Sequence, residues 1–385
     1  MINRRAATAI FLSSVIGLFT AGRIDAGVNH WTTYGPTVDG QSAGVYALAL
    51  EPRDPLTVYA GVGDYDPAQP NVFFSSLVKT TDGGRSWERT GLNKVAVIGA
   101  IAVDPASPDV VFAGASQPSI CPGICQQTGP GGLFRSTDGG SSWWEVSGGL
   151  EDLQYVMSLV IDPTASRITY VGTWHGAWKS TDGGSTWASK GLGGYETGQV
   201  GVILRMDPRD PSVLYASTDG GVFKTTDGME TWVGPLLGAG QSPYLLTGVA
   251  IDPSDSSRVW IGSNTGLYRS SDGGASWGPA PYPEEGRTPP TQIVDVQFDP
   301  GNPLILYVMT GVRAPLFRSI DGGNTWTAWS DGLRPSYPWK TLAIDAAGEH
   351  LYLGMDLIYD LEIPHEPAKV LPRPSAPTVP VSGRP

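Results

Sequence analysis

The sequence predicts an all-β protein built from repeated units, and three observations lead to this expectation. Gly (51 residues) and Pro (33 residues) are abundant, whereas charged residues make up only 16% of the 385-residue chain. This composition favours short strands joined by tight turns over surface helices. A turn motif recurs six times, and an apolar strand that ends in an acidic residue recurs seven times. A repeat architecture can absorb the whole length in one body.

The turn motif has eight residues, as in Ser180-Thr-Asp-Gly-Gly-Ser-Thr-Trp187. Successive copies place their aspartates 56, 44, 45, 45 and 49 residues apart, a regularity that excludes chance similarity. Asp accepts hydrogen bonds from nearby backbone N–H groups, Gly supplies a positive φ, and Trp is a large apolar wedge between neighbouring units. We therefore expect a structural role for the repeated residues. They are Asp82, Asp138, Asp182, Asp227, Asp272 and Asp321, with Trp87, Trp143, Trp187, Trp232, Trp277 and Trp326.

The second repeat lies upstream of the turns. Ile101–Pro105 followed by Val110–Gly114 is one copy, in which an alternating apolar strand ends in Asp-Pro and a β-branched or aromatic strand follows. We expect each unit to be a four-stranded blade whose outer strand begins at the turn tryptophan. Seven such units predict a seven-bladed β-propeller. Their acidic residues are Glu51, Asp104, Asp162, Asp207, Asp252, Asp299 and Asp345.

Only six turns accompany the seven units, and the N-terminus explains the difference. Trp31 precedes Glu51 by 20 residues, the same step that separates Trp187 from Asp207. We expect residues 30–34 to supply the outer strand of the last blade, because this closes the ring and removes its unpaired edges.

The two ends of the chain fall outside the repeats. Arg4 and Arg5 precede an apolar stretch, so residues 1–26 are predicted to be a signal peptide, and the protein is predicted to be secreted or periplasmic. Residues 27–362 form the predicted propeller. Residues 363–385 contain seven prolines and are predicted to be an extended tail or linker.

Charge and cysteine content restrict the partners. Removing residues 1–26 takes away three arginines and one aspartate, which changes the formal charge from −12 to −14. Nucleic acid and anionic lipid are poor partners for so acidic a chain. We expect no membrane span after signal cleavage, and a monomer. Cys121 and Cys125 are the two cysteines, and in an exported protein such a close pair favours a small disulfide loop over a redox or zinc site.

The six turns resemble the Asp box, also called the bacterial neuraminidase repeat, which has the form Ser/Thr-x-Asp-x-Gly-x-Ser/Thr-Trp. The resemblance covers residues 29–361 and implies an Asp-box β-propeller, similar in fold to sialidases, xyloglucan hydrolases, sortilin-type receptors and photosystem II assembly-factor-like proteins. It matches no single enzyme family closely. It implies a structural role for the turn carboxylates and, for the related enzymes, activity on the face opposite the turns. Proteins of one fold differ in chemistry, so the resemblance assigns no activity.

The loops on that opposite face differ in length between units. The segment between the second and third strands spans 9 residues from Tyr170 to Lys179, but 20 from Tyr59 to Lys79 and 23 from Phe112 to Arg135. Insertions on a rigid scaffold often carry binding specificity. Ordinary variation of loop length, with the second loop held by the predicted disulfide, explains the same lengths equally well.

Candidate ligand-binding residues gather on the same predicted face. Arginines entering or within the sixth and seventh units have the bidentate geometry that suits a carboxylate, as in the arginine clamp of sialidases. A different anionic ligand, or surface arginines without a ligand, would fit the same pattern. An adjacent Trp-His pair at a loop tip would stack on a sugar or a peptide, and packing would account for its tryptophan too. The candidates are Arg287, Arg313, Arg334, Tyr282, Tyr337, Trp174 and His175.

No catalytic constellation assembles from the sequence. Several acidic residues have suitable positions for a hydrolytic carboxylate pair, but none is singled out. The four histidines lack metal-ligand spacing, so we expect no metal and no cofactor. The first hypothesis is an exported, non-enzymatic propeller that binds a protein, peptide or glycan on its loop face. The alternative is a glycan-active hydrolase or lyase, sialidase-like or xyloglucanase-like, with its carboxylates in the central funnel.

Overall fold

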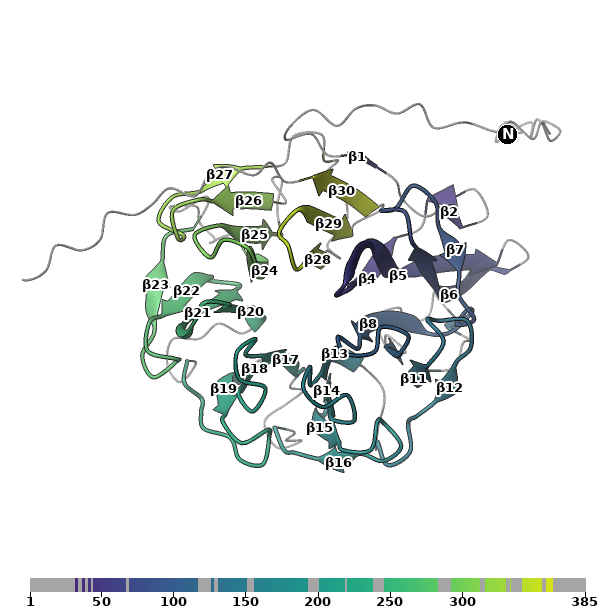
Figure 1. Cartoon of the computed structure of the whole chain (residues 1–385), viewed down its shortest axis with the longest axis horizontal. Coiled ribbons are helices and arrows are strands. Elements are labelled where there is room, and N and C mark those ends of the chain that lie inside the picture. Colours follow the sequence, from purple (N-terminus) through teal and green to yellow (C-terminus); the bar gives the residue numbers. More distant parts are fainter. Residues whose placement is uncertain are drawn as a thin grey trace, which may run out of the picture.

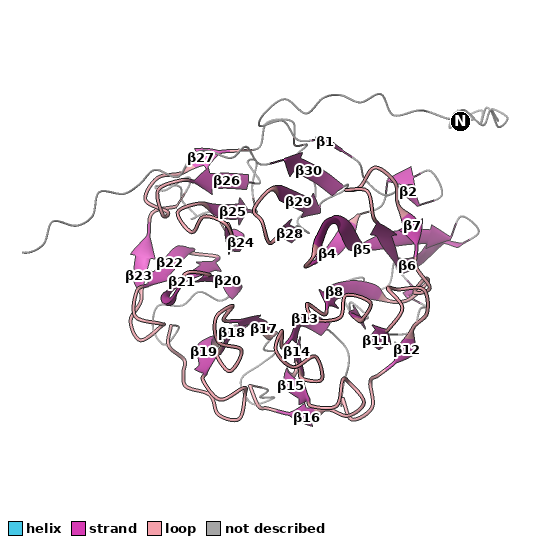
Figure 2. Ribbon diagram, viewed as in Figure 1, coloured by secondary structure: helices cyan, strands magenta, loops and turns pink. Residues whose placement is uncertain are grey.

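The protein is an all-β propeller. The computed structural model describes residues 32–33, 37–38, 41–42, 44–66, 69–116, 126–127, 131–150, 156–192, 201–218, 220–237, 246–282, 292–311, 316–329, 333, 341–354 and 358–362. These ranges contain strands β1 to β30, turns and loops, and no helix (Figure 2). The sheets radiate from a central axis, with one strand of each nearest to the centre (Figure 1). The predicted all-β propeller class is confirmed.

Six blades have four strands or more, and each is an antiparallel meander that runs from the centre of the ring to its edge. The first three are β4 (Val45–Glu51), β5 (Asp54–Asp66), β6 (Gln69–Thr80) and β7 (Glu88–Arg89); β8 (Val97–Val103), β9 (Val111–Ser116), β11 (Gly132–Ser136) and β12 (Trp144–Glu145); and β13 (Val156–Ile161), β14 (Thr169–Thr173), β15 (Gly176–Ser180) and β16 (Ala188–Ser189). The others are β20 (Leu246–Asp252), β21 (Asp255–Ser263), β22 (Gly266–Ser270) and β23 (Gly278–Ala280); β24 (Ile293–Phe298), β25 (Leu306–Thr310), β26 (Leu316–Ser319) and β27 (Thr327–Ala328); and β28 (Thr341–Ile344), β29 (His350–Gly354), β30 (Ile358–Glu362) and β1 (Thr32–Thr33).

The prediction of seven four-stranded blades is wrong, because the described residues form six such blades. The fourth repeat unit forms a three-stranded sheet of β17 (Ile203–Met206), β18 (Leu214–Thr218) and β19 (Gly221–Thr225). Beyond its turn, Val233 makes an isolated bridge to Lys224, and further backbone hydrogen bonds to β19 join Val222 to Leu236 and Leu237 without forming a regular strand. Gly234 and Pro235 follow at once, and proline has no N–H with which to continue a ladder. The repeat count therefore overestimated the number of complete blades.

The first and last blades meet in space. β1 pairs antiparallel with β30, so residues near the N-terminus provide the outer strand of the last sheet. Deeper in the same interface, Tyr352 of β29 packs with Val45 and Val58 of the first blade. The Tyr352 hydroxyl donates a hydrogen bond to the carbonyl of Pro55 at 3.0 Å. A separate two-stranded hairpin of β2 (Thr37–Val38) and β3 (Gln41–Ser42) lies between β1 and β4 in sequence.

The hydrophobic core lies between neighbouring sheets. Tyr215 and Val222 of the β17–β19 sheet pack with Val249, Val259 and Ile261 of the β20–β23 blade. β9, β14 and β18 are buried along their whole length, as expected for the middle strands of packed blades. Burial of these apolar side chains drives the sheets together around the axis.

Candidate functional site

Each of the six turns has the same internal hydrogen-bond network, which Asp182 illustrates. Its Oδ1 accepts from the backbone N–H of Thr186 at 2.9 Å and from the Ser180 hydroxyl at 2.8 Å, and its Oδ2 accepts from the Thr186 hydroxyl at 2.6 Å. The hydroxyl of Thr186 is the main reason that the pKa of Asp182 falls to about 2. Both carboxylate oxygens are therefore engaged within their own turn. The same bond from a backbone N–H occurs at Asp82, Asp138, Asp227, Asp272 and Asp321.

The turns also hold neighbouring sheets together, through residues that sequence reasoning did not single out. The Tyr215 hydroxyl and the Lys224 ammonium, from β18 and β19, both donate to the carbonyl of Gly273 in the next turn, each at 2.8 Å. The Lys224 Nζ lies 5.2 Å from the centre of the Tyr215 ring. Desolvation raises the pKa of Tyr215, so its hydroxyl remains a donor. The signal was present in the sequence, because the residue before each of the six turns is Lys or Arg.

Three of the turn tryptophans bond to the preceding sheet. The indole Nε1 of Trp187 donates to the carbonyl of Val146 at 2.8 Å, and Trp232 donates to Lys190 at 2.9 Å. Trp326 reaches the carbonyl of Pro281 in the same way, at 2.8 Å. At these three positions the turn joins its own sheet to the sheet before it. The turns on this face therefore help to hold neighbouring sheets together.

Most of the predicted ligand-binding cluster lies outside the described residues. This holds for Arg287, Arg313, Arg334 and Tyr337. Tyr282 is half-buried and packs against the core cluster shared by the β20–β23 and β24–β27 blades. The predicted disulfide residues Cys121 and Cys125, the predicted signal peptide at 1–26 and the predicted tail at 363–385 also fall outside the described ranges.

Trp174 and His175 form the turn between β14 and β15 and are half-buried. The backbone N–H of His175 donates to the Thr173 hydroxyl at 3.2 Å. They belong to the β13–β16 blade, whereas Tyr282 follows the β20–β23 blade, and the β17–β19 sheet lies between the two (Figure 1). The structure therefore does not bring these predicted residues into one site.

The two loop insertions come together. β5 and β6 continue far beyond the length of the corresponding strands in other blades, reaching Asp66 and Gln69. β10 (Gln126–Gln127), from the insertion of the next blade, pairs in parallel with Val72 and Phe73 of β6. The hairpin projects from the ring in Figure 1. We call the pairing of residues 64–74 with β10 the insertion platform.

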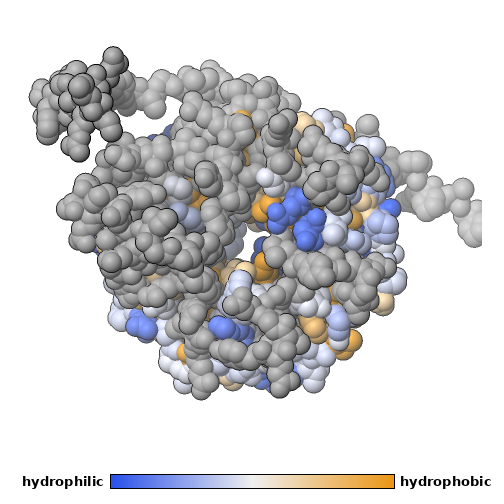
Figure 3. Space-filling model, turned by 180° about the vertical axis from the view of Figure 1, so that it is seen from behind, coloured by the Kyte–Doolittle hydropathy of each residue, from blue (hydrophilic) through white to orange (hydrophobic). Residues whose placement is uncertain are grey.

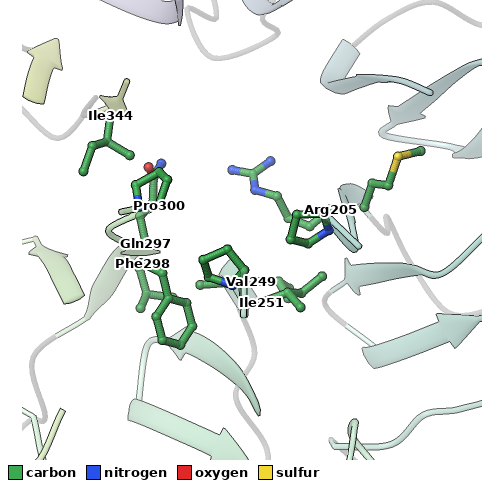
Figure 4. Close-up of a pocket in the computed structure, with 12 residues that line it drawn as sticks. Arg205, Val249, Ile251, Gln297, Phe298, Pro300 and Ile344 are labelled. Carbon is green, nitrogen blue, oxygen red and sulfur yellow. The ribbon is translucent and has the colours of Figure 1, made fainter. Parts of the chain in front are cut away.

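A pocket of about 290 Å³ lies beside the central axis, in the part of the ring formed by the fourth to seventh repeat units (Figure 4). It is lined by inner strands β17, β20, β24 and β28. Three prolines of the lining, Pro208, Pro253 and Pro300, each follow the acidic residue at the end of an inner strand. These strand ends lie on the turn face, so the pocket opens on that face. Seen from behind, the ring has an opening at its centre (Figure 3). The lining residues are Arg205, Met206, Pro208, Val249, Ala250, Ile251, Pro253, Val296, Gln297, Phe298, Pro300 and Ile344.

Arg205 is the charged residue of this lining, and its guanidinium points across the pocket towards the strand that carries Gln297 (Figure 4). Asp295 lies two residues before Gln297 on β24 and is 9% exposed. Its carboxylate accepts hydrogen bonds from the Val296 N–H at 2.9 Å and the Gln297 Nε2 at 3.1 Å. Desolvation raises the pKa of Asp295, and the positive charge of Arg205 opposes that rise.

These three polar residues were missed because they interrupt a repeat instead of forming a motif. Two positions before the acidic residue, Arg205 and Gln297 stand where the other units carry Ala or Val. The other five residues at this position are Ala49, Ala102, Val160, Ala250 and Ala343. Aligning the units would have revealed two polar side chains on the inner strands.

Among the described residues no three His, Cys, Asp or Glu side chains are grouped as metal ligands would be. No helix in this part of the chain is long and apolar enough to cross a membrane.

Comparisons with known proteins identify the fold. No family model matches the chain. A xyloglucanase from Hypocrea jecorina (strain QM6a) is 32% identical over 116 residues, which cover 27% of this chain and 12% of the xyloglucanase. The chain thus spans about an eighth of that relative.

Solved structures resemble a larger part of the chain. An ancestral GH74 enzyme has a TM-score of 0.61 at 18% identity, over 86% of this chain and 46% of the enzyme. YCF48 bound to D1 peptide has a TM-score of 0.60 at 16% identity, over 88% and 98% of the two chains. Sqt1 from Chaetomium thermophilum has a TM-score of 0.53 at 13% identity, over 85% and 98%. At these identities the likenesses show the fold alone, and this chain has the fold of a β-propeller.

Proposed function

We propose that this protein is an exported, non-enzymatic propeller that recognises a peptide or protein partner on its loop face, over the insertion platform. The observation that carries the proposal is the pairing of β10 with β6. Described residues of two insertions from different blades belong to one sheet there. Non-repeated segments on a rigid scaffold commonly carry recognition.

The difference between the repeated turn residues and the non-repeated insertion platform supports the same proposal. The turn carboxylates are used in their own turns, and the turn backbone bonds to neighbouring sheets. These residues repeat because every unit needs them, whereas the insertion platform occurs in one place. A propeller that holds a peptide is known among the structural neighbours, since YCF48 is seen bound to D1 peptide.

We also infer that the six turns are Asp boxes, and that residues 1–26 direct export. The hydrogen bonds of Asp182 support the first inference, because they explain why the motif needs Asp, Ser or Thr at fixed positions. N-terminal sequencing of the exported chain tests the second, with cleavage expected after Gly22 or Ala26. In that compartment Cys121 and Cys125 should resist alkylation until a reductant is added.

The experiment for the main proposal replaces residues 64–74 with Asn-Gly, a pair that favours a two-residue hairpin turn. Partners are captured by cross-linking from the exported fraction of the source cells, with the unmodified chain as the reference. The control is Ile320→Ser, which changes an exposed side chain on the turn face. We expect the captured partner to be lost with the shortened hairpin and kept with the control. A partner retained by the shortened chain would contradict the proposal.

Glycan hydrolysis is the second candidate, and the 116-residue similarity to a xyloglucanase is the observation that favours it. Incubation with xyloglucan, followed by measurement of new reducing ends, separates the two proposals. The non-enzymatic proposal expects no release above the rate of a heat-inactivated sample. Release that scales with protein concentration would support the hydrolase instead.

A further inference from the structure

We propose that the pocket on the turn face binds a small ligand in which a carboxylate is joined to an aliphatic group, with Arg205 as the residue that holds the carboxylate. This site lies on the opposite face from the insertion platform and does not depend on the function proposed above.

The first step of the argument is the position of Arg205. Leu204 is fully buried and Arg205 is partly exposed, as the alternation of side chains along β17 requires. Most other units carry alanine at the position of Arg205. The packing of the blade does not need an arginine there, since alanine satisfies it elsewhere. Packing of the repeat units therefore does not account for an arginine at this position.

The second step is the unused hydrogen-bonding capacity of Arg205. A guanidinium has five N–H donors. One bond is present among the described residues, from Nη1 to the carbonyl of Leu204 at 3.2 Å. Asp295 influences Arg205 electrostatically, but its oxygens are bonded to Val296 and Gln297, and the two side chains form no ion pair. Arg205 thus presents donors to the pocket in a fork that matches a carboxylate.

The third step is the chemistry of the other walls. Ile251 of β20 and Ile344 of β28 contribute apolar atoms to the lining, and Val249 and Phe298 line it from the core, 2% and 6% exposed. A volume of about 290 Å³ is at the small end for ligand sites. Apolar walls strengthen a charge interaction by lowering the local dielectric constant. They favour a compact ligand with one charge and an aliphatic body.

The charge balance selects a carboxylate over a phosphate. The pocket has one cationic side chain, and the whole chain has a formal charge of −12. A phosphate dianion would bring a second negative charge for which the lining supplies no second cation. A monocarboxylate matches the single guanidinium and uses its paired N–H groups.

The test uses 4-methylpentanoic acid and its neutral analogue 4-methylpentanamide, with binding followed by calorimetry or by NMR titration of the unmodified mature chain. The acid is expected to bind at least about tenfold more tightly than the amide, equivalent to about 1.4 kcal/mol. Arg205→Met should remove this preference, and Arg205→Lys should keep part of it, because the charge remains while the fork is lost. Acetyl-Ala-Ala-Leu, as acid and as amide, shows whether a peptide C-terminus is a better source of the carboxylate than a free acid.

Two matched variants complete the design. Arg209→Met removes a nearby exposed arginine that bonds to the carbonyl of Ser254 and does not line the pocket, so acid binding should not change. Asp295→Asn removes the carboxyl that interacts electrostatically with Arg205, so acid binding should stay the same or strengthen. Circular dichroism confirms that each variant is folded. Equal binding of acid and amide, an unaltered preference in Arg205→Met, or no binding of any acid at millimolar concentration would overturn the proposal.

Discussion

The turn face and the loop face of this ring are made of the same seven repeat units but follow opposite rules. On the turn face, Asp182 and Thr186 do in one unit what their counterparts do in the others, and Trp187 bonds to the preceding sheet. On the loop face, among the residues that the structure describes, the extension of the β5–β6 hairpin and its pairing with β10 occur in one blade. The residues that repeat in every unit hold the sheets together. The segments that do not repeat provide the surfaces available for recognition.

The largest effect is expected from the contact that closes the ring. A mature chain that begins at residue 36 instead of residue 27 lacks β1, which leaves the edge of β30 unpaired. We expect its melting temperature to fall further than that of any point variant described here. Removing residues 363–385 is the control and should leave the melting temperature unchanged. Equal melting of the full-length chain and the chain without β1 would contradict a cohesive role for this strand.

Tyr215 tests the bond between one sheet and the next turn. Tyr215→Ala should lower the free energy of unfolding by about 3–5 kcal/mol, because it empties a fully buried site. Tyr215→Phe keeps the ring and removes the hydroxyl that donates to Gly273, so a loss of about 0.5–1.5 kcal/mol is expected. Urea unfolding measures both. Equal losses in the two variants would mean that the hydroxyl, and not ring packing, dominates.

Acid should weaken the turn face. The pKa of Asp138, Asp182 and Asp272 falls from 3.8 to about 2 on folding. A lowered pKa stabilises the folded protein fully above the unfolded value, and this contribution is lost as the pH falls through the folded value. The melting temperature should therefore drop as the pH falls from about 4 to about 2. Asp182→Asn should reduce this dependence, whereas a dependence identical to that of the unmodified chain would contradict the assignment.

Burial acts in the opposite direction at two other carboxyls. It raises the pKa of Asp295 and Asp299, so their contribution to stability is present below the unfolded pKa and is lost as the pH rises through the folded value. The comparison between Asp182→Asn and the unmodified chain separates the turn contribution from theirs.

The smallest effect on stability is expected on the loop face. Replacing residues 64–74 with Asn-Gly removes the projecting part of the hairpin and keeps the pairing of Gly63 with Ser75 nearer the ring. We expect the free energy of unfolding to change by less than about 0.5 kcal/mol, measured by urea unfolding. A loss as large as that of Tyr215→Ala would assign the insertion platform to the structural frame and would weaken the contrast between the two faces.

Much of the fold was predictable because each repeat carries its own local rules. The Asp-Gly turns need few residues and short-range hydrogen bonds, so their motif is readable in any one unit. The number of complete blades was not predictable from the repeat count, because the fourth unit is interrupted at Gly234-Pro235 and has no regular fourth strand after its turn.

The pocket was harder to foresee than the fold. Arg205 is far in the sequence from Asp295 and Gln297, and the three residues match no motif. They come together because β20, which carries Gly248, lies between β17 and β24. A Cβ on Gly248 would lie 2.6 Å from Oδ1 of Asp295, so the carboxyl occupies space that a side chain would otherwise fill. The grouping depends on which sheets are neighbours in the ring.

The sequence by itself determined the all-β class, the repeated turns and the positions of the loop insertions, because periodic apolar residues and short turn motifs act over a few residues. The tertiary structure decided which units complete a blade, that lysines and tyrosines of one sheet bond to the turn of the next, and that Arg205 faces an apolar pocket beside the axis. These outcomes depend on contacts between units some 45 residues apart, and such contacts exist only once the sheets have packed around a common axis.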